Sequence, residues 1–151
     1  MPMTEQEKDY WHFIEPIWDQ INIYDGADIF LSTYATAKPP AGAIYAAHFA
    51  QSEICNGGFY QLFSNSTGVL SPEAVQGFRL IGMDKTAGLL NAAMEMLGNT
   101  FPRDRGARQK VLKNLSKEKF DQLDKAFFKE IAQENGGFVA AANAFVSKLD
   151  T

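Results

Sequence analysis

The sequence predicts an all-α fold, a single compact domain of seven or eight helices around a central, charge-poor helix pair. Apolar residues recur three and four positions apart along most of the chain, which is the spacing of one face of a helix. Helix start and stop signals separate these stretches, and we find no convincing alternation of polar and apolar residues that would indicate strands. The chain has 151 residues, 46% of them apolar, which is enough to enclose one core.

The first helices are predicted within residues 4–36. A capping box begins at Thr4, and apolar residues at helical spacing follow it. Pro16 should kink this helix, or end it and begin another, because proline has no N–H to donate inside a helix. Asp25 is the expected N-cap of a short helix that two prolines end at residues 39 and 40.

The central helix pair is predicted between residues 40 and 68. Residues 40–55 are apolar on most sides, which indicates a buried helix. Gly57 and Gly58 interrupt it, and helical spacing resumes at Phe59. Glycine weakens a helix but allows close backbone approach, so we expect a corner between two central helices here.

The remaining helices follow the same kind of signal. Ser71 is the expected cap of a helix that ends near Gly82, and Asp84 the expected cap of one that ends at Gly98. The last helices are placed at residues 103–114, 117–133 and 137–149. We find no internal repeat and no low-complexity segment.

Cysteine content and hydropathy limit the classes of protein that fit. The single cysteine, Cys55, excludes an internal disulfide framework and is typical of a reducing cytoplasm. We see no secretory signal and no run of about 18 apolar residues that could span a membrane. The sequence therefore predicts a cytoplasmic protein without membrane attachment.

Residues 39–72 contain one formal charge, Glu53, yet their second half is rich in polar side chains. Buried polar groups gathered in this way must form a satisfied network. In one interpretation they cap and brace the helix corner, with Asn56 as the cap and Glu53 accepting backbone amides. In the other they line a pocket for a polar ligand. The candidate residues are His48, Glu53, Asn56, Gly57, Gly58, Gln61, Asn65 and Ser66.

Chemistry at this cluster has few candidates. Glu53 could act as a general acid or base, and a nucleophilic pair of Cys55 with His48 is conceivable. A structural cap and a buried small apolar residue are the simpler interpretations of Glu53 and Cys55. With two histidines and no metal-binding, phosphate-binding or catalytic motif, the sequence predicts no metal and no cofactor, and it favours a protein that is not an enzyme.

Charge is unevenly distributed. Residues 1–70 carry eight acids against two bases, whereas residues 103–119 carry seven bases against two acids. The basic stretch is a solvated helix face, a set of phosphate contacts, or a surface that meets the acidic half of a second copy in a homodimer. We expect no direct binding of nucleic acid. The acids of the candidate acidic face are Glu5, Glu7, Asp9, Glu15, Asp19, Asp25 and Asp28.

The segment EICNGGFYQLFSNSTG, with its NGGFxQxFxNSxG pattern, resembles a bacterial domain family of unknown function that is related to a DNA-mimic protein. The resemblance covers most of the chain, from the acidic first helix through FPRDRGARQ. It implies an all-helical fold. For the mimic it also implies surface carboxylates that imitate duplex phosphates and occupy the DNA-binding face of a transcription factor.

Two functions follow as hypotheses. The first is a protein-interaction module that binds a DNA-binding protein, or another basic protein, through the acidic face. The alternative is a small-ligand-binding domain or an enzyme with a polar cleft around Glu53 and Asn56. An amphipathic first helix with a solvated acidic face would also explain the acids.

Overall fold

Helices account for all the regular structure of the protein in the computed structural model, which describes residues 9–149. Within these residues eight α-helices and four short 3-10 helices follow one another, and no strand occurs. The all-α prediction is confirmed. In chain order the elements are α1 Tyr10–Ile14, η1 Glu15–Gln20, α2 Ala27–Tyr34, α3 Ala41–Ser64, η2 Ser66–Leu70, α4 Ser71–Leu80, α5 Asp84–Glu95, α6 Arg105–Lys113, η3 Lys117–Phe120, α7 Asp121–Gln133, η4 Glu134–Gly136 and α8 Phe138–Leu149.

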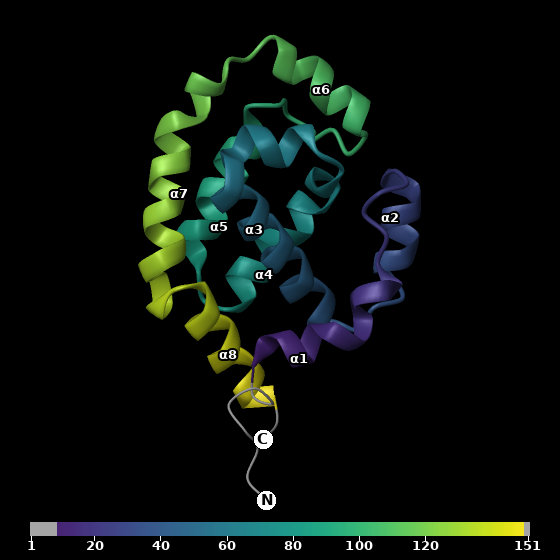
Figure 1. The fold of residues 1–151 in the computed structure, drawn as a ribbon, viewed down its shortest axis with the longest axis vertical. Helices are drawn as coiled ribbons and strands as arrows, with labels where there is room; N and C mark the ends of the chain where they lie inside the picture. The colour runs from purple at the N-terminus through teal and green to yellow at the C-terminus, as the bar shows by residue number, and fades with distance from the viewer. Residues whose placement is uncertain (1–8, 150–151) are drawn as a thin grey trace, which may run out of the picture.

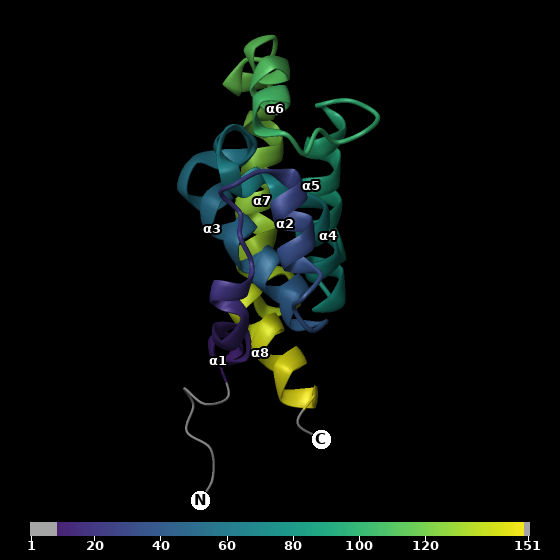
Figure 2. The same cartoon turned by 90° about the vertical axis from the view of Figure 1, so that its right-hand side faces the viewer.

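The long helix α3 lies at the centre, as its lack of charge predicts. It packs against α4, η2, α6 and α7, and its first half also contacts α1. Figure 1 shows α3 and α4 in the middle, with α7 and α8 on one side and α2 on the other, and Figure 2 shows the same arrangement from the side. The buried apolar residues form one core cluster around α3. Among the described helices, none has the length and apolar character needed to cross a membrane.

The contact between α3 and α4 is unusually close at Gly77. A Cβ atom added there would lie 2.1 Å from the backbone oxygen of Ala43 and 3.0 Å from the Cβ of Ala47. Small residues on both helices therefore set their separation, because any larger side chain would meet backbone atoms.

The amino-terminal segment breaks at Pro16 as predicted. Asp9 caps α1 by accepting a hydrogen bond from Trp11 N at 2.9 Å, and Pro16 stands in the first turn of η1, where its missing N–H costs nothing. The capping box expected at Thr4 lies outside the described residues.

The predicted N-caps of α2 and α4 are wrong, as are those of α5 and of the second half of α3 described below. Gly26, with φ of 102°, occupies the cap position of α2, while Asp25 accepts a hydrogen bond from the Asn22 amide instead. Ser71 is the first residue of α4, and its hydroxyl donates to the backbone oxygen of Gly68 at 2.8 Å. Both side chains bond to a residue that precedes the helix, Asp25 to Asn22 and Ser71 to Gly68, and not to the first N–H groups of the helix.

The amino end of α5 is capped by a residue distant in sequence. Asp84, the expected cap, is the first helical residue. The carboxylate of Glu134 accepts hydrogen bonds from Lys85 N at 2.7 Å and from Thr86 N at 2.8 Å, and also from the Thr86 hydroxyl at 2.8 Å. A negative group at the positive end of α5 thus ties this helix to the end of α7.

Replacing Glu134 by alanine should lower the free energy of unfolding by about 1–2 kcal/mol, because two helix N–H groups and the buried Thr86 hydroxyl lose their acceptor. Equilibrium urea unfolding measures this change. Glu118→Ala removes an exposed acid of the same type and should change stability by less than about 0.5 kcal/mol. Equal stability of the two variants would show that Glu134 is not the cap.

Candidate functional site

Gly58 makes the predicted corner inside α3. Its φ of 80° and ψ of −178° interrupt the helix, and a Cβ there would lie 2.7 Å from the Asp124 carboxylate. Asp124 Oδ1 accepts a hydrogen bond from Phe59 N at 2.9 Å. Asp124 on α7 therefore caps the second half of α3, in place of the expected cap Asn56. Burial raises the pKa of Asp124, and the Phe59 N–H opposes that rise.

Glu53 bridges the two halves of α3 through side-chain amides. Its carboxylate accepts hydrogen bonds from Gln61 Nε2 at 2.7 Å and from Asn65 Nδ2 at 3.1 Å. The Gln61 side chain passes directly over Gly57, where a Cβ would lie 1.8 Å from Gln61 Oε1. The bonds expected from Glu53 to helix N–H groups are replaced by these amide bonds, and Gly57 leaves room for them.

Arg108 of α6 caps the carboxyl end of α3, a role that the sequence analysis did not predict for this residue of the basic stretch. Its side chain is 0% exposed, and its guanidinium donates to the backbone oxygens of Phe63 at 2.8 Å and Asn65 at 2.8 Å, and also to that of Arg103. Burial lowers the pKa of Arg108 to about 10, and the positive charge of Arg105 contributes to this decrease. Arg108 therefore remains charged at neutral pH. The buried guanidinium donates to backbone oxygens at the carboxyl end of α3, where the helix provides no further N–H partners.

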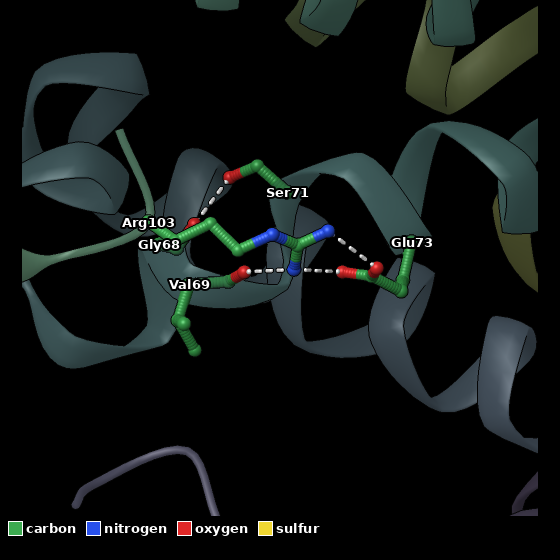
Figure 3. A network of polar contacts seen from close by, with 5 residues as sticks. All are labelled: Gly68, Val69, Ser71, Glu73 and Arg103. Carbon is green, nitrogen blue, oxygen red and sulfur yellow. Dashed lines mark hydrogen bonds and ion pairs between the residues drawn. The ribbon is translucent and has the colours of Figure 1, made fainter. Parts of the chain in front are cut away.

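A second arginine of the basic stretch also points inward. Arg103 forms two parallel bonds of 2.8 Å to the Glu73 carboxylate and donates to the Val69 backbone oxygen at 3.1 Å (Figure 3). Beside it, the Ser71 hydroxyl bonds to the backbone oxygen of Gly68 (Figure 3). This bidentate pair joins the segment before α6 to the first turn of α4.

The basic stretch is thus only partly a solvated helix face. Arg108 is buried, Arg103 is half-buried in its ion pair with Glu73, and Arg105 donates to the backbone oxygen of Ser64 at 2.9 Å. The exposed cations of the stretch are mainly its lysines, Lys110, Lys113, Lys117 and Lys119. Contact with a second copy of the chain stays a prediction, and it would depend on these lysines.

His48 lies apart from the Glu53 network. Its Nδ1 is 2.8 Å from the Tyr10 hydroxyl, and aromatic rings of Trp11, Trp18 and Phe49 surround it. Burial lowers the pKa of His48. Its contacts with Tyr10 and the surrounding rings help to hold α1 against α3, so His48 belongs to the packing of this end of the molecule.

The arrangement does not support the Cys55–His48 pair. Cys55 is exposed rather than buried, its Sγ is 4.0 Å from Gln51 Oε1, and burial of part of the side chain raises its pKa. A raised pKa disfavours the thiolate that a nucleophile needs. Among residues 9–149, no three histidine, cysteine or acidic side chains are grouped so that they could hold a metal ion.

Two hollows lie along the outer face of α3. The larger, of about 540 Å³, is lined by Glu53, Asn56 and other residues of α3, by Ile23 and Tyr24 of the loop before α2, and by Thr67. The smaller, of about 250 Å³, is lined by Asp19, Trp18 and Tyr45 and shares Tyr24 and Phe49 with the first. Glu53 and Asn56 therefore do reach one cleft, as the ligand-binding hypothesis requires, but His48 does not line it.

Most acids of the candidate acidic face that lie within the described residues are exposed. Glu15, Asp19, Asp25 and Asp28 are exposed, Asp9 is half-buried as the cap of α1, and no lysine or arginine occurs from residue 9 to residue 37. Glu5 and Glu7 lie outside the described residues. The segment α1, η1 and α2 follows one edge of the molecule, in purple and dark blue in Figure 1. Within this segment, His12 Nδ1 lies 3.8 Å from Glu15 Oε2.

Comparison with known proteins gives one match. A family model described as "DMP19-like protein" matches residues 35–148. No curated protein and no solved structure matches the chain. The match covers the corner of α3 and helices α4 to α8, whereas the acidic first helix, which the resemblance was expected to include, precedes it.

Proposed function

The chain belongs to the DMP19-like family, and from that premise we propose that it is a protein-interaction module that binds a DNA-binding protein through its acidic face. The family is one of DNA mimics. A mimic presents negative charge to a DNA-binding protein, in place of the charge that this protein would meet on a DNA duplex.

The absence of positive charge from the described acidic segment is the observation that carries the proposal. Over residues 9–37 five acids occur with no lysine or arginine, and four of those acids are exposed. Duplex DNA presents about one negative charge per 1.7 Å of its axis, and a surface that replaces it needs acids uninterrupted by bases. Such a surface also attracts a basic partner from a distance, at rates that salt reduces.

Apolar side chains on the same segment favour a protein partner. Tyr24 is 75% exposed, and Trp11, Ile29 and Leu31 are also exposed. Protein interfaces combine exposed aromatic and aliphatic anchors with a charged rim, so these residues would supply contact area between the acids.

The test begins with capture of partners from the lysate of the host on the tagged full-length protein, followed by elution with rising salt. We expect a DNA-binding protein that salt releases and that duplex DNA displaces. Retention of basic proteins in general, with no displacement by duplex DNA, would contradict DNA mimicry.

Charge removal then locates the surface. The triple variant Glu15→Gln, Asp19→Asn, Asp28→Asn should weaken binding of the captured partner by roughly tenfold at low salt, because each lost charge contributes a fraction of a kcal/mol. The matched control Glu95→Gln, Glu118→Gln, Asp121→Asn removes three exposed acids from other helices and should change affinity less than about threefold. Equal losses would show that net charge, and not this face, governs binding.

Binding of a small polar ligand is the second candidate function, because the cleft of about 540 Å³ reaches both Glu53 and Asn56. This function and the protein-interaction function predict different effects of substitutions on binding. A ligand held inside the cleft would bind with an affinity that depends on Glu53 but not on Glu15 or Asp28, which lie on other elements.

A further inference from the structure

The two hollows on the outer face of α3 are neighbours that share Tyr24 and Phe49, and we call them together the α3 groove. One wall is a single face of α3, where Tyr45, Phe49, Glu53 and Asn56 succeed one another at helical spacing. The opposite wall is the chain from Trp18 to Tyr24. Tyr24 and Phe49 belong to both hollows, so they divide the groove into two compartments.

The wall that carries Tyr24 is held firmly although its tip is exposed. Asn22 Oδ1 accepts hydrogen bonds from Tyr24 N at 2.8 Å and from Asp25 N at 3.2 Å, and Asn22 N donates to Thr33 Oγ1 at 3.0 Å. This asparagine turn fixes the backbone of Tyr24 while 75% of the residue remains exposed. A tyrosine on a fixed backbone has only two side-chain torsions left to order when a partner packs on it.

Each compartment has one carboxylate without a cation. Glu53 lies in the larger compartment and Asp19 in the smaller, and neither forms an ion pair with a described residue. No lysine or arginine lines either compartment. Gln61 and Asn65 hold the Glu53 carboxylate in place through neutral amides, which leave its negative charge uncompensated.

Aromatic residues line both compartments, with Tyr24 and Phe49 common to the two. Trp18 and Tyr45 line the smaller compartment with ring centroids 5.7 Å apart, and Trp18 and Phe49 lie 4.5 Å apart. Aromatic faces attract cations, and a guanidinium can stack on a ring while it donates to a carboxylate. The chemistry of both compartments therefore fits the side chain of arginine better than an anion or an apolar group.

We infer that the α3 groove receives two arginine side chains of the basic partner, one beside Glu53 and one beside Asp19, with Tyr24 packed between them. The inference rests on the proposed function and refines it, because it adds shape-specific contacts to a surface otherwise described by charge. Arginines that contact DNA phosphates and bases are the residues that a mimic must engage. Two compartments on one wall would also fix the orientation of the partner.

The first test uses a defined probe, a fluorescein-labelled peptide of four Arg-Gly-Gly repeats, and the same peptide with lysine in place of arginine. Fluorescence anisotropy should show at least fivefold tighter binding of the arginine peptide. Tyr24→Ala and Glu53→Gln should each weaken the arginine peptide about tenfold and the lysine peptide much less. Phe128→Ala on α7, which removes another exposed aromatic side chain, should have no effect.

Tyr24→Ala is the decisive variant, since an exposed side chain can be removed without loss of folding, whereas Glu53→Gln also alters the corner. Unchanged binding of the arginine peptide by Tyr24→Ala, or equal affinity for both peptides, would overturn the inference. A third outcome would overturn the inference in favour of the ligand-binding role. In it, the wild-type protein retains a small polar metabolite that Glu53→Gln does not retain, and neither variant changes the binding of the peptides.

The captured partner then separates this inference from the proposed function. If the acidic triple variant loses partner binding but Tyr24→Ala does not, the groove inference fails and the mimic proposal stands. If neither variant affects a partner that duplex DNA fails to displace, the proposed function itself fails. If both variants lose binding and the Phe128→Ala control does not, both are supported.

Discussion

Substitution of Arg108 by methionine should lower the free energy of unfolding by about 3–5 kcal/mol. The guanidinium is fully buried and is the donor for the backbone oxygens of Phe63, Asn65 and Arg103. Methionine has similar length and would fill the space, but the backbone oxygens of Phe63 and Arg103 would lose this donor, and that of Asn65 would keep only its bond from Gly68 N. Each unsatisfied carbonyl costs about 1–3 kcal/mol, and that sum exceeds the gain from removing a buried charge.

Urea unfolding followed by circular dichroism measures this loss, and Arg105→Met is the matched control. Arg105 lies one turn earlier on α6, is exposed and donates to one backbone oxygen, that of Ser64. Its replacement should cost less than about 1 kcal/mol. Arg108→Lys should restore little, because one ammonium cannot reproduce the planar fork that reaches three oxygens. A cost below 1 kcal/mol for Arg108→Met would refute the role assigned to the guanidinium.

The second large effect is expected at Gly77. Gly77→Ala should destabilise the protein by about 2–3 kcal/mol, since overpacking a close helix contact displaces backbone. The new methyl group would lie 2.1 Å from the backbone oxygen of Ala43, so α3 and α4 would have to separate. The intrinsic preference of helices for alanine, worth up to about 1 kcal/mol, offsets only part of this.

Gly88→Ala is the matched control for Gly77→Ala. Gly88 also lies inside a helix, α5, but a Cβ there meets nothing within 4 Å. This variant should be more stable than the wild type by about 0.5–1 kcal/mol. Opposite signs in the thermal unfolding midpoints would confirm that packing and not propensity governs position 77. A stabilising Gly77→Ala would contradict the close contact.

Much of the fold could be predicted from the sequence because its signals are local. The corner at Gly57 and Gly58 was predicted from the interruption of helical spacing, and the break at Pro16 from its missing N–H. The caps were predicted less well. Asp124 and Glu134 cap helices that begin about 65 and 50 residues earlier in the chain, and such partners are chosen by packing, which periodicity does not reveal.

The candidate site was predicted as one cluster, but the structure divides it. His48 and Glu53 are five residues apart, which at about 100° per residue places them on faces of the helix roughly 140° apart. Gln61 and Asn65 reach Glu53 only because Gly58 turns the chain back toward it. Arg108 gave no local signal either, since an arginine on a charged helix is normally solvated.

The position of the acidic segment has a consequence for how such a protein can evolve. The bonds that secure the corner come from residues between Glu53 and Asp124, whereas the acids lie on α1, η1 and α2 at one edge. Exchange of the exposed residues on that edge therefore leaves the interior intact, provided that its buried side chains, such as Ile14 and Phe30, are kept. A lineage built on this scaffold can acquire a new binding target by altering the exposed positions of α1, η1 and α2, while selection for folding acts on the buried positions and on the bonds of the corner.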